Sequence, residues 1–220
     1  NFDELKNILS HHGSCEIFYS TCDLEIQGDR DILVNEIKSY TNHINVLINN
    51  AAYIGVSNLE DWNVPFEQQS VETWSRALGV NLTAPFDLSK QFSKLLRKSG
   101  NASIINVGSI YGLLGPNWDL YEGTTMGNPA AYAASKGGLI QLTRWLATSL
   151  APDIRVNCVS PGGIFRNQPE NFIERYKTMT PLGRMAQEED FRGVFAYLAS
   201  DLSKYVTGQN LVVDGGWTVW

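Results

Sequence analysis

The chain has 220 residues, of which 43% are hydrophobic and 18% are charged, and it carries a formal net charge of −6. This composition is typical of a globular protein, and we expect residues 1–220 to form one domain. Because the chain is acidic and has no basic run, we expect neither nucleic acid nor an acidic membrane as a partner. No segment approaches about 18 uninterrupted apolar residues, so the sequence predicts no membrane span. The polar first ten residues predict an amphipathic helix rather than a signal peptide.

Residue types that commonly bind metals are few and scattered along the chain. They are Cys15, Cys22, Cys158, His11, His12 and His43. The cysteines form no CxxC pair, and adjacent histidines do not share a helical face as i, i+4 ligands would. We therefore expect no metal site, and we expect reduced cysteines packed as small buried residues in a cytoplasmic protein.

Strand-length apolar runs alternate with longer segments of helical periodicity. In chain order we expect a strand over 15–24, a helix over 29–42, a strand over 44–52, a helix over 70–100, a strand over 102–110, a helix over 128–152, a strand over 154–164, a helix over 188–203 and a strand over 209–216. Ser70 and Asn128 are expected helix caps, with Pro129 in a first turn and Gly100 as a stop. This alternation predicts an α/β fold, a parallel sheet covered by helices on both faces.

Polar and small residues cluster where the predicted strands end. Asp23 closes the first strand, residues 49–52 the second, Ser109 the third and residues 161–164 the fourth. In open parallel sheets, ligands bind beyond the carboxyl ends of the strands. The sequence therefore predicts one ligand crevice at this edge of the sheet.

Tyr132 and Lys136 are spaced to lie one turn apart on the same face of a helix. A phenol has a pKa near 10, and a cation one turn away favours its phenolate form, which makes the pair suitable for acid–base catalysis. The alternative interpretation is a solvent-facing pair with no chemical role.

Six motifs, in order, resemble the short-chain dehydrogenase/reductase family. They cover most of the chain, from about Asp23 to Gly216: NNAA (49–52), VNLTAPF (80–86), INVGSIYG (105–112), YAASK (132–136), VNCVSPGGI (156–164) and VDGG (213–216). The resemblance implies a Rossmann-like, doubly wound three-layer α/β/α domain that binds NAD or NADP. It also implies that the protein interconverts an alcohol and a ketone or aldehyde by hydride transfer and proton relay.

By this resemblance the catalytic residues are Tyr132, Lys136, Ser109 and Asn81. Ser109 would orient and polarise the substrate carbonyl, although a serine after a strand is also a common turn former. Asn81 would hold a water that passes protons to the lysine. Asparagine is a poor helix former, so a helix defect or a satisfied side-chain hydrogen bond is the alternative for Asn81.

The resemblance also implies a set of cofactor contacts. Asp23 and Leu24 would contact the adenine, Asn50, Ala51 and Ala52 the adenosine ribose, Tyr132 and Lys136 the nicotinamide ribose, and Pro161, Gly162 and Ile164 the nicotinamide amide. An N-cap or loop aspartate is the competing interpretation of Asp23. Ala52 stands where the family usually has glycine, which costs little if its φ is negative.

The glycine-rich phosphate loop of a nucleotide-binding domain is absent from the printed sequence. We expect that about 40 residues, the length of one βαβ unit with an added helix, precede the first printed residue. The residue that distinguishes NAD from NADP follows the second strand of such domains, so the preference stays open.

One segment differs from the common family spacing, and another is expected to cover the substrate. Residues 113–129 are an insertion between Ser109 and Tyr132, and residues 165–186 are an expected substrate-capping segment. We expect Trp118 and Tyr121 to stack on a sugar ring, Asp119 and Glu122 to bind hydroxyl or amino groups, and Arg166 to meet a phosphate or an anionic substrate. The alternatives are a structural flap for the insertion and an exposed loop residue for Arg166.

The insertion resembles oxidoreductases of flagellin modification and surface-sugar biosynthesis, so the leading substrate is a polar small molecule such as a sugar derivative. A 3-oxoacyl-carrier-protein reductase, a catalytically silent nucleotide-binding scaffold and a nucleotide-sugar epimerase or dehydratase are the alternatives. The helices 70–100 and 128–152 carry wide apolar faces, and the family resemblance implies that they form a four-helix contact between subunits of a homotetramer or dimer. The alternative is that these faces pack only on their own sheet.

Overall fold

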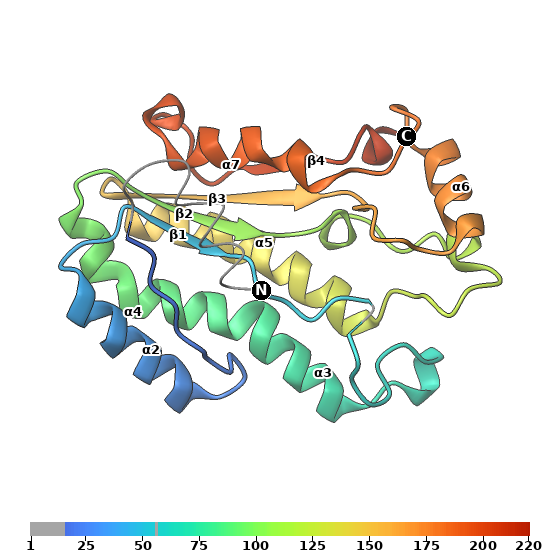
Figure 1. Ribbon diagram of the computed structural model, residues 1–220, viewed down its shortest axis with the longest axis horizontal. Helices are drawn as coiled ribbons and strands as arrows, with labels where there is room; N and C mark the ends of the chain where they lie inside the picture. Colours follow the sequence, from blue (N-terminus) through green and yellow to red (C-terminus); the bar gives the residue numbers. More distant parts are fainter. Residues whose placement is uncertain (1–15, 56) are drawn as a thin grey trace.

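A four-stranded parallel sheet organises the computed structural model, which describes residues 16–55 and 57–220 (Figure 1). Its strands lie in the order β1-β2-β3-β4: β1 (Val46–Asn49), β2 (Ala102–Val107), β3 (Ile154–Pro161) and β4 (Asn210–Val213). Every neighbouring pair is parallel, which confirms the predicted α/β sheet. The strands are shorter than expected because their last residues turn away at the carboxyl edge.

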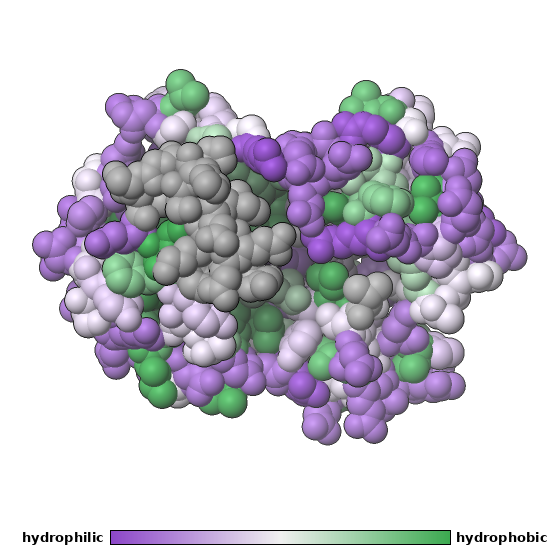
Figure 2. Space-filling model, in the orientation of Figure 1, coloured by the Kyte–Doolittle hydropathy of each residue, from purple (hydrophilic) through white to green (hydrophobic). Residues whose placement is uncertain are grey.

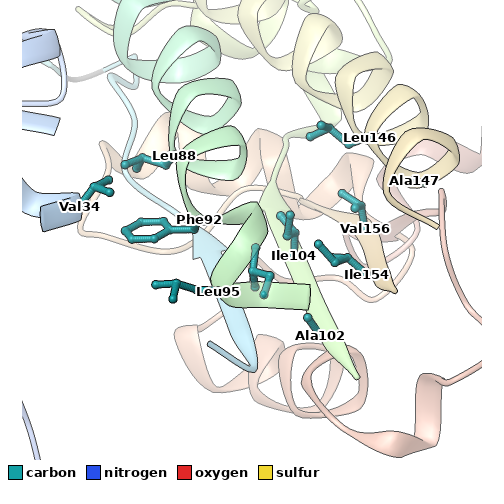
Figure 3. Close-up of a cluster of buried hydrophobic side chains, with 11 residues drawn as sticks. Val34, Leu88, Phe92, Leu95, Ala102, Ile104, Leu146, Ala147, Ile154 and Val156 are labelled. Atoms are coloured by element: carbon teal, nitrogen blue, oxygen red, sulfur yellow. The ribbon is translucent and has the colours of Figure 1, made fainter. Parts of the chain in front are cut away.

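Helices cover both faces of the sheet (Figure 1). One face carries α2 (Gln27–Tyr40), α3 (Val71–Leu78), α4 (Ala84–Lys98) and α5 (Ala130–Leu150). Figure 3 shows how α2, α4 and α5 enclose side chains of β2 and β3, with Phe92 and Ile104 fully buried between them. On the other face α7 (Arg192–Ala199) buries Leu198 against Ile105 and Val159.

The segment expected as one helix over 70–100 is helical from Val71 to Lys98, but its middle is a wider π turn at Gly79–Thr83. Pro85 explains the wider turn because it has no N–H for the carbonyl one turn before it. Both predicted ends are confirmed. The Ser70 hydroxyl accepts a hydrogen bond from the Thr73 N–H at 3.1 Å, and Gly100 follows the helix at φ 77°.

Two predicted features were wrong. Residues 16–24 form no strand, because no strand lies beside them among the described residues to complete a ladder; the segment instead ends in a turn at Asp23. The predicted N-terminal helix and Cys15, His11 and His12 lie outside the described residues. Asn128 is not a helix cap. Pro129 takes the cap position of α5, and the Gln69 side chain accepts from the first N–H of the helix at 3.0 Å.

Short helices account for the remaining differences. The helix expected over 188–203 divides into a 3-10 turn (Glu188–Phe191), α7 and a second 3-10 turn (Asp201–Ser203). A helix that the sequence did not predict, α6 (Glu170–Met179), lies inside the segment 165–186. No helix in the described part of the chain is long and apolar enough to cross a membrane.

A buried ion pair fastens α2 to α4. The Arg30 guanidinium donates to the Asp87 carboxylate at 2.8 Å and to the Leu24 carbonyl at 2.6 Å, and Gln91 donates to the second carboxylate oxygen at 3.3 Å. Both charged residues are at most 9% exposed. Removing one partner would therefore leave an unpaired charge in an apolar environment.

We predict that Arg30→Met lowers the free energy of unfolding by about 3 kcal/mol, because it strands the Asp87 carboxylate. The double variant Arg30→Met/Asp87→Leu should recover most of that loss, since apolar side chains replace both charges. Arg97→Met is the control: its pair with Asp153 is exposed and contributes about 1 kcal/mol or less. Urea denaturation measures all three, and equal losses for Arg30→Met and Arg97→Met would contradict the prediction.

Candidate functional site

Tyr132 and Lys136, the predicted catalytic pair, lie at the carboxyl edge of the sheet. Tyr132 and Lys136 lie one turn apart on α5, with the Lys136 Nζ 5.8 Å from the centre of the Tyr132 ring. Lys136 is only 3% exposed and donates from Nζ to the Val107 carbonyl, at the end of β2, at 2.6 Å. Figure 2, in the orientation of Figure 1, shows a hollow in the middle of the face that it presents, with hydrophobic residues in it.

Ser109 reaches the same place from the end of β2. Its hydroxyl is buried and accepts a hydrogen bond from the Tyr111 N–H at 3.2 Å, which starts a 3-10 turn over Ile110–Gly112. Gly112 lets this turn rest on α5: a Cβ there would stand 2.8 Å from the Lys136 backbone carbon. A close backbone approach thus holds Ser109 beside the helix that carries Tyr132 and Lys136.

Burial decides the charge state of this pair. It lowers the pKa of Lys136 to about 8 and raises the pKa of Tyr132, while the Ser109 hydroxyl opposes the rise by hydrogen bonding. The sequence predicted that Lys136 would favour the phenolate form of Tyr132. In the protein itself, burial instead raises the pKa of Tyr132 and favours the neutral phenol. The Lys136 Nζ donates to the Val107 carbonyl and lies over the face of the Tyr132 ring, not beside its hydroxyl. The effect of burial on the pKa of Tyr132 is therefore larger than the effect of the nearby cation. Tyr132 is a neutral phenol that can donate a proton at neutral pH.

We predict that Lys136→Met stabilises the protein at pH 7. Burial of a cation whose pKa falls from 10.5 to about 8 costs about 3 kcal/mol, offset in part by the lost hydrogen bond to Val107. Between pH 8 and pH 10.5 the unfolded lysine binds more protons than the folded one, so wild-type stability rises with pH there. The advantage of the variant should therefore shrink from pH 7 to pH 10.

Chemical denaturation at the two pH values measures this difference. Lys90→Met, at an exposed position of α4, is the matched control and should change stability little at either pH. A variant of Lys136 that is less stable than wild type at pH 7 would contradict the prediction.

Asn81 in the π turn is held by protein partners at both ends of its amide. Its Oδ1 accepts from the Tyr53 N–H at 2.8 Å, and its Nδ2 donates to the Tyr53 carbonyl and to the Ser135 hydroxyl, both at 3.0 Å. Ser135 in turn donates to the Tyr132 carbonyl at 2.8 Å. The satisfied side chain and the widened helix that the sequence left as alternatives are both present. Asn81 thus connects α5 to the segment after β1.

The residues expected on the adenosine side lie around the end of β1. Asn50 and Ala51 are exposed and Ala52 is partly buried, so backbone is accessible there. The Asp23 carboxylate accepts from the Glu25 N–H at 2.9 Å, which is the loop role named as its alternative. Leu24 packs against the core of α2 and α4.

The turn after β3 is fixed by close contacts. The Gly162 N–H donates to the Val213 carbonyl at 2.9 Å, and a Cβ on Gly162 would stand 2.8 Å from the Asp214 Cα. Ile164 forms a parallel bridge with Ala186, so the two ends of the segment 165–186 lie side by side just after β3. Close contacts and this bridge therefore fix the path of the backbone beside the end of β3.

The insertion 113–129 packs on α6 in one aromatic cluster, which we call the Tyr121 cluster. Its buried members are Ile110, Leu120, Tyr121, Phe172, Ile173, Tyr176, Met185 and Trp217. Tyr121 lies 5.6 Å from Phe172, and Tyr176 stacks on Trp217 at 4.4 Å between ring centres. The insertion is therefore a packed structural element of this chain and not a free loop.

The residues expected to bind substrate in this region are exposed, buried or paired with other side chains. Trp118 is 59% exposed, and Asp119 and Glu122 are exposed. Arg175 on α6 pairs with Glu122, with 3.9 Å between Nη2 and Oε2. Arg166 forms an exposed ion pair with Glu188 at 2.7 Å, which agrees with an exposed loop residue. Tyr121 is buried, so its ring faces are covered by protein.

Three residues at this edge were missed as site residues by the sequence analysis. The Tyr111 hydroxyl contacts that of Tyr121 at 2.5 Å, the Tyr176 hydroxyl accepts from the Gly163 N–H at 2.5 Å, and the buried Asn128 amide has no partner among the described residues. Only Tyr111 had a signal, because it follows the candidate Ser109 by two residues. No group of three metal-binding side chains is present among the described residues.

Comparisons with known proteins cover almost the whole chain. A family model described as enoyl-(acyl carrier protein) reductase matches residues 3–218. Post-translational flagellin modification protein A of Campylobacter coli is 32% identical over 215 residues, spanning 97% of this chain and 82% of that protein. A short-chain dehydrogenase from Leptospira borgpetersenii with bound NAD+ has a TM-score of 0.80 and 35% identity, covering 94% of this chain and 80% of that one. A gluconate 5-dehydrogenase from Burkholderia cenocepacia, solved with NADP and tartrate, has a TM-score of 0.77 and 25% identity, covering 90% and 74%.

Proposed function

Because the chain belongs to the short-chain dehydrogenase/reductase family, we propose that it interconverts an alcohol and a carbonyl on a polar small molecule through Tyr132, Ser109 and Lys136. It is an NAD(P)-dependent oxidoreductase of that family. The observation that carries the assignment of residues is the pair of a partly buried Tyr132 and a buried Lys136, held beside Ser109 at the end of β2.

The residues at the carboxyl edge fit the nicotinamide half of the cofactor. Lys136 uses Nζ once, toward Val107, and keeps two N–H donors for ribose hydroxyls. Asn50 and Ala51 are exposed and Ala52 is partly exposed beyond β1, and Pro161, Gly162 and Ile164 are partly exposed beyond β3. Asp23 and Leu24 complete the proposed set at the adenine. When bound, the cofactor supplies or accepts the hydride.

Side chains of the protein transfer the proton. Tyr132 donates its phenolic proton to the substrate oxygen during reduction and removes a proton from the alcohol during oxidation. Ser109 holds the same oxygen by a hydrogen bond and polarises it. Asn81 positions the helix of Tyr132 through Ser135. Because burial raises the pKa of Tyr132, the phenol keeps its proton at neutral pH, which is the form that donates in the reduction step.

We predict that Tyr132→Phe reduces turnover by about 10² to 10⁴-fold, because it removes the proton donor without changing the shape of the site. Affinity for NADH or NADPH should stay within about twofold of wild type by fluorescence titration, since Lys136 is untouched. Tyr205→Phe, at a fully exposed position, is the matched control. Full activity of Tyr132→Phe on any accepted substrate would refute the assignment.

A sugar derivative is the substrate class that we favour. The Campylobacter relative is named for flagellin modification, and the Burkholderia protein is named a dehydrogenase of gluconate, a sugar acid. Reduction of a 3-oxoacyl carrier protein is the second candidate, because relatives from Thermotoga maritima and Chlamydia pneumoniae that are 35% and 34% identical are named 3-oxoacyl-[acyl-carrier-protein] reductases. A packed insertion over the site and an acidic chain with no basic run disfavour docking of an acidic carrier.

Self-association is part of the proposal. Some apolar residues of α4 and α5 are buried in the core of this chain and cannot contact a second copy: Leu88, Phe92, Leu139 and Leu146. Trp74, Phe86 and Trp145 stay 38%, 42% and 58% exposed on α3, α4 and α5. Large apolar side chains exposed on neighbouring helices are suited to a symmetric contact with a second copy, giving a homodimer or, with two such contacts, a homotetramer.

We predict that Trp145→Glu lowers the molar mass of the intact protein in solution, because it places a charge in the proposed contact. Light scattering measures the change. Leu202→Glu, at an exposed site on the far side of the fold near α7, is the control and should leave the mass unchanged. A wild-type protein with monomer mass would rule the contact out.

A further inference from the structure

The turn after β3 has one backbone donor that no group of the protein uses. The Gly162 N–H donates to the Val213 carbonyl at 2.9 Å, and the Gly163 carbonyl accepts from the Ala186 N–H, also at 2.9 Å. The Ile164 N–H has no hydrogen-bond acceptor among the described residues. It belongs to the same peptide group as the Gly163 carbonyl, and in a planar trans peptide group these two point in opposite directions. The Ile164 N–H therefore points away from Ala186, at a partly exposed position.

Tyr176 of α6 holds the peptide group that comes just before this one. Its hydroxyl accepts from the Gly163 N–H at 2.5 Å. A Cβ on Gly163 would stand 2.7 Å from the Tyr176 ring, and a Cβ on Gly162 would stand 3.0 Å from its hydroxyl, so glycine at both positions permits the approach. Two consecutive peptide groups are thus each held by a hydrogen bond, one to Tyr176 and one to Ala186. Together the two bonds set the direction of the Ile164 N–H.

The Tyr176 ring is fixed by its own neighbours. It is 2% exposed, and it stacks on Trp217 with 4.4 Å between ring centres and on Phe172 with 6.0 Å. The C-terminal segment that carries Trp217 is also attached to the end of α6, because the Trp220 Nε1 donates to the Met179 carbonyl at 3.2 Å. The Tyr176 hydroxyl therefore has one place in the fold, and it can determine the place of the turn.

We propose that Tyr176 is a positioning residue for the nicotinamide half of the bound cofactor and that it acts through Gly163. Its hydrogen bond aligns the turn so that the free Ile164 N–H can donate to the carbonyl oxygen of the nicotinamide amide. Without the hydroxyl, the backbone at Gly163 can rotate, since glycine has few steric restrictions, and the Ile164 N–H loses its fixed direction. Ile164 is already a proposed contact of that amide, so this inference rests on the proposed oxidoreductase function.

The test compares two ligands that differ in the nicotinamide ring, NADH and ADP-ribose, or NADPH and 2′-phospho-ADP-ribose. Each is titrated by calorimetry into the intact protein and into Tyr176→Phe, which removes one hydroxyl and keeps the stacked ring. We expect the variant to bind the dinucleotide about 3 to 10-fold more weakly, the effect of one net hydrogen bond. Its affinity for the ligand without nicotinamide should stay within about twofold of wild type, because the adenosine half contacts other segments.

Tyr121→Phe is the matched control. It removes another buried phenolic hydroxyl of the Tyr121 cluster, one that contacts Tyr111 and not the turn after β3. Its affinity for both ligands should stay within about twofold of wild type. An equal selective loss of dinucleotide affinity in Tyr121→Phe would contradict the role of the Gly163 hydrogen bond.

Trp217→Leu tests whether the stacked ring acts through the same hydroxyl. It should also weaken dinucleotide binding selectively, because the Tyr176 ring loses its neighbour. In the Tyr176→Phe background the same substitution should have little further effect on this affinity, since residues that act through one contact are not additive. Fully additive losses would contradict a path through the Tyr176 hydroxyl.

The two ligands separate positioning from a general structural role. Equal weakening of both ligands in Tyr176→Phe would assign Tyr176 to structure alone and overturn the proposal, as would unchanged affinity for both. Failure of wild type to bind either dinucleotide would reject the oxidoreductase function itself. Normal binding of a dinucleotide by wild type, with no selective loss in Tyr176→Phe, would reject only this inference.

Discussion

Burial of the Lys136 ammonium at the end of β2 is the constraint on which the arrangement of the site depends. The Val107 carbonyl holds Nζ at 2.6 Å, and little of the side chain reaches solvent. This fixes the rotation of α5 against the sheet and therefore the place of Tyr132, one turn earlier. The same burial lowers the pKa of Lys136 to about 8 and makes the site costly to fold. Such a cost is typical of functional positions and rare in a packing residue.

Two further contacts maintain that geometry from opposite sides. Gly112 allows the turn after Ser109 to lie directly on the backbone of α5. Asn81 reaches α5 through Ser135 and at the same time holds both backbone polar groups of Tyr53. The π turn that presents Asn81 follows from the sequence, because Pro85 cannot complete a regular helical turn. The segment after β1 and the helix α5 are thus connected by one amide.

The insertion 113–129 gives the site its second boundary. Its Leu120 and Tyr121 are part of a packed aromatic cluster with α6, so the insertion and the segment 165–186 form one unit over the carboxyl edge. Shortening the insertion would remove buried side chains and expose this cluster. Point substitutions at polar atoms are therefore the informative way to examine substrate recognition, because they leave the packing in place.

Much of the fold followed from local patterns. Alternating apolar runs and helical periodicity predicted the parallel sheet, and Ser70 and Gly100 predicted the ends of a long helix, because capping and left-handed turns depend on neighbouring residues only. Strand formation is different. Residues 16–24 have strand composition, but a strand requires a neighbour for its ladder, and no pattern within the segment reports whether one is present.

The candidate site divides in the same way. The four-residue spacing of Tyr132 and Lys136 determines that they share a helical face, and the motif order brought Ser109 to the same edge of the sheet. Which polar groups are left unpaired there was decided only by the tertiary structure. Tyr111 meets Tyr121, and Asn128 loses its expected capping role to Gln69, through contacts between segments far apart in sequence. Local periodicity contains no information about such contacts, because burial and hydrogen-bond partners are set when the elements pack.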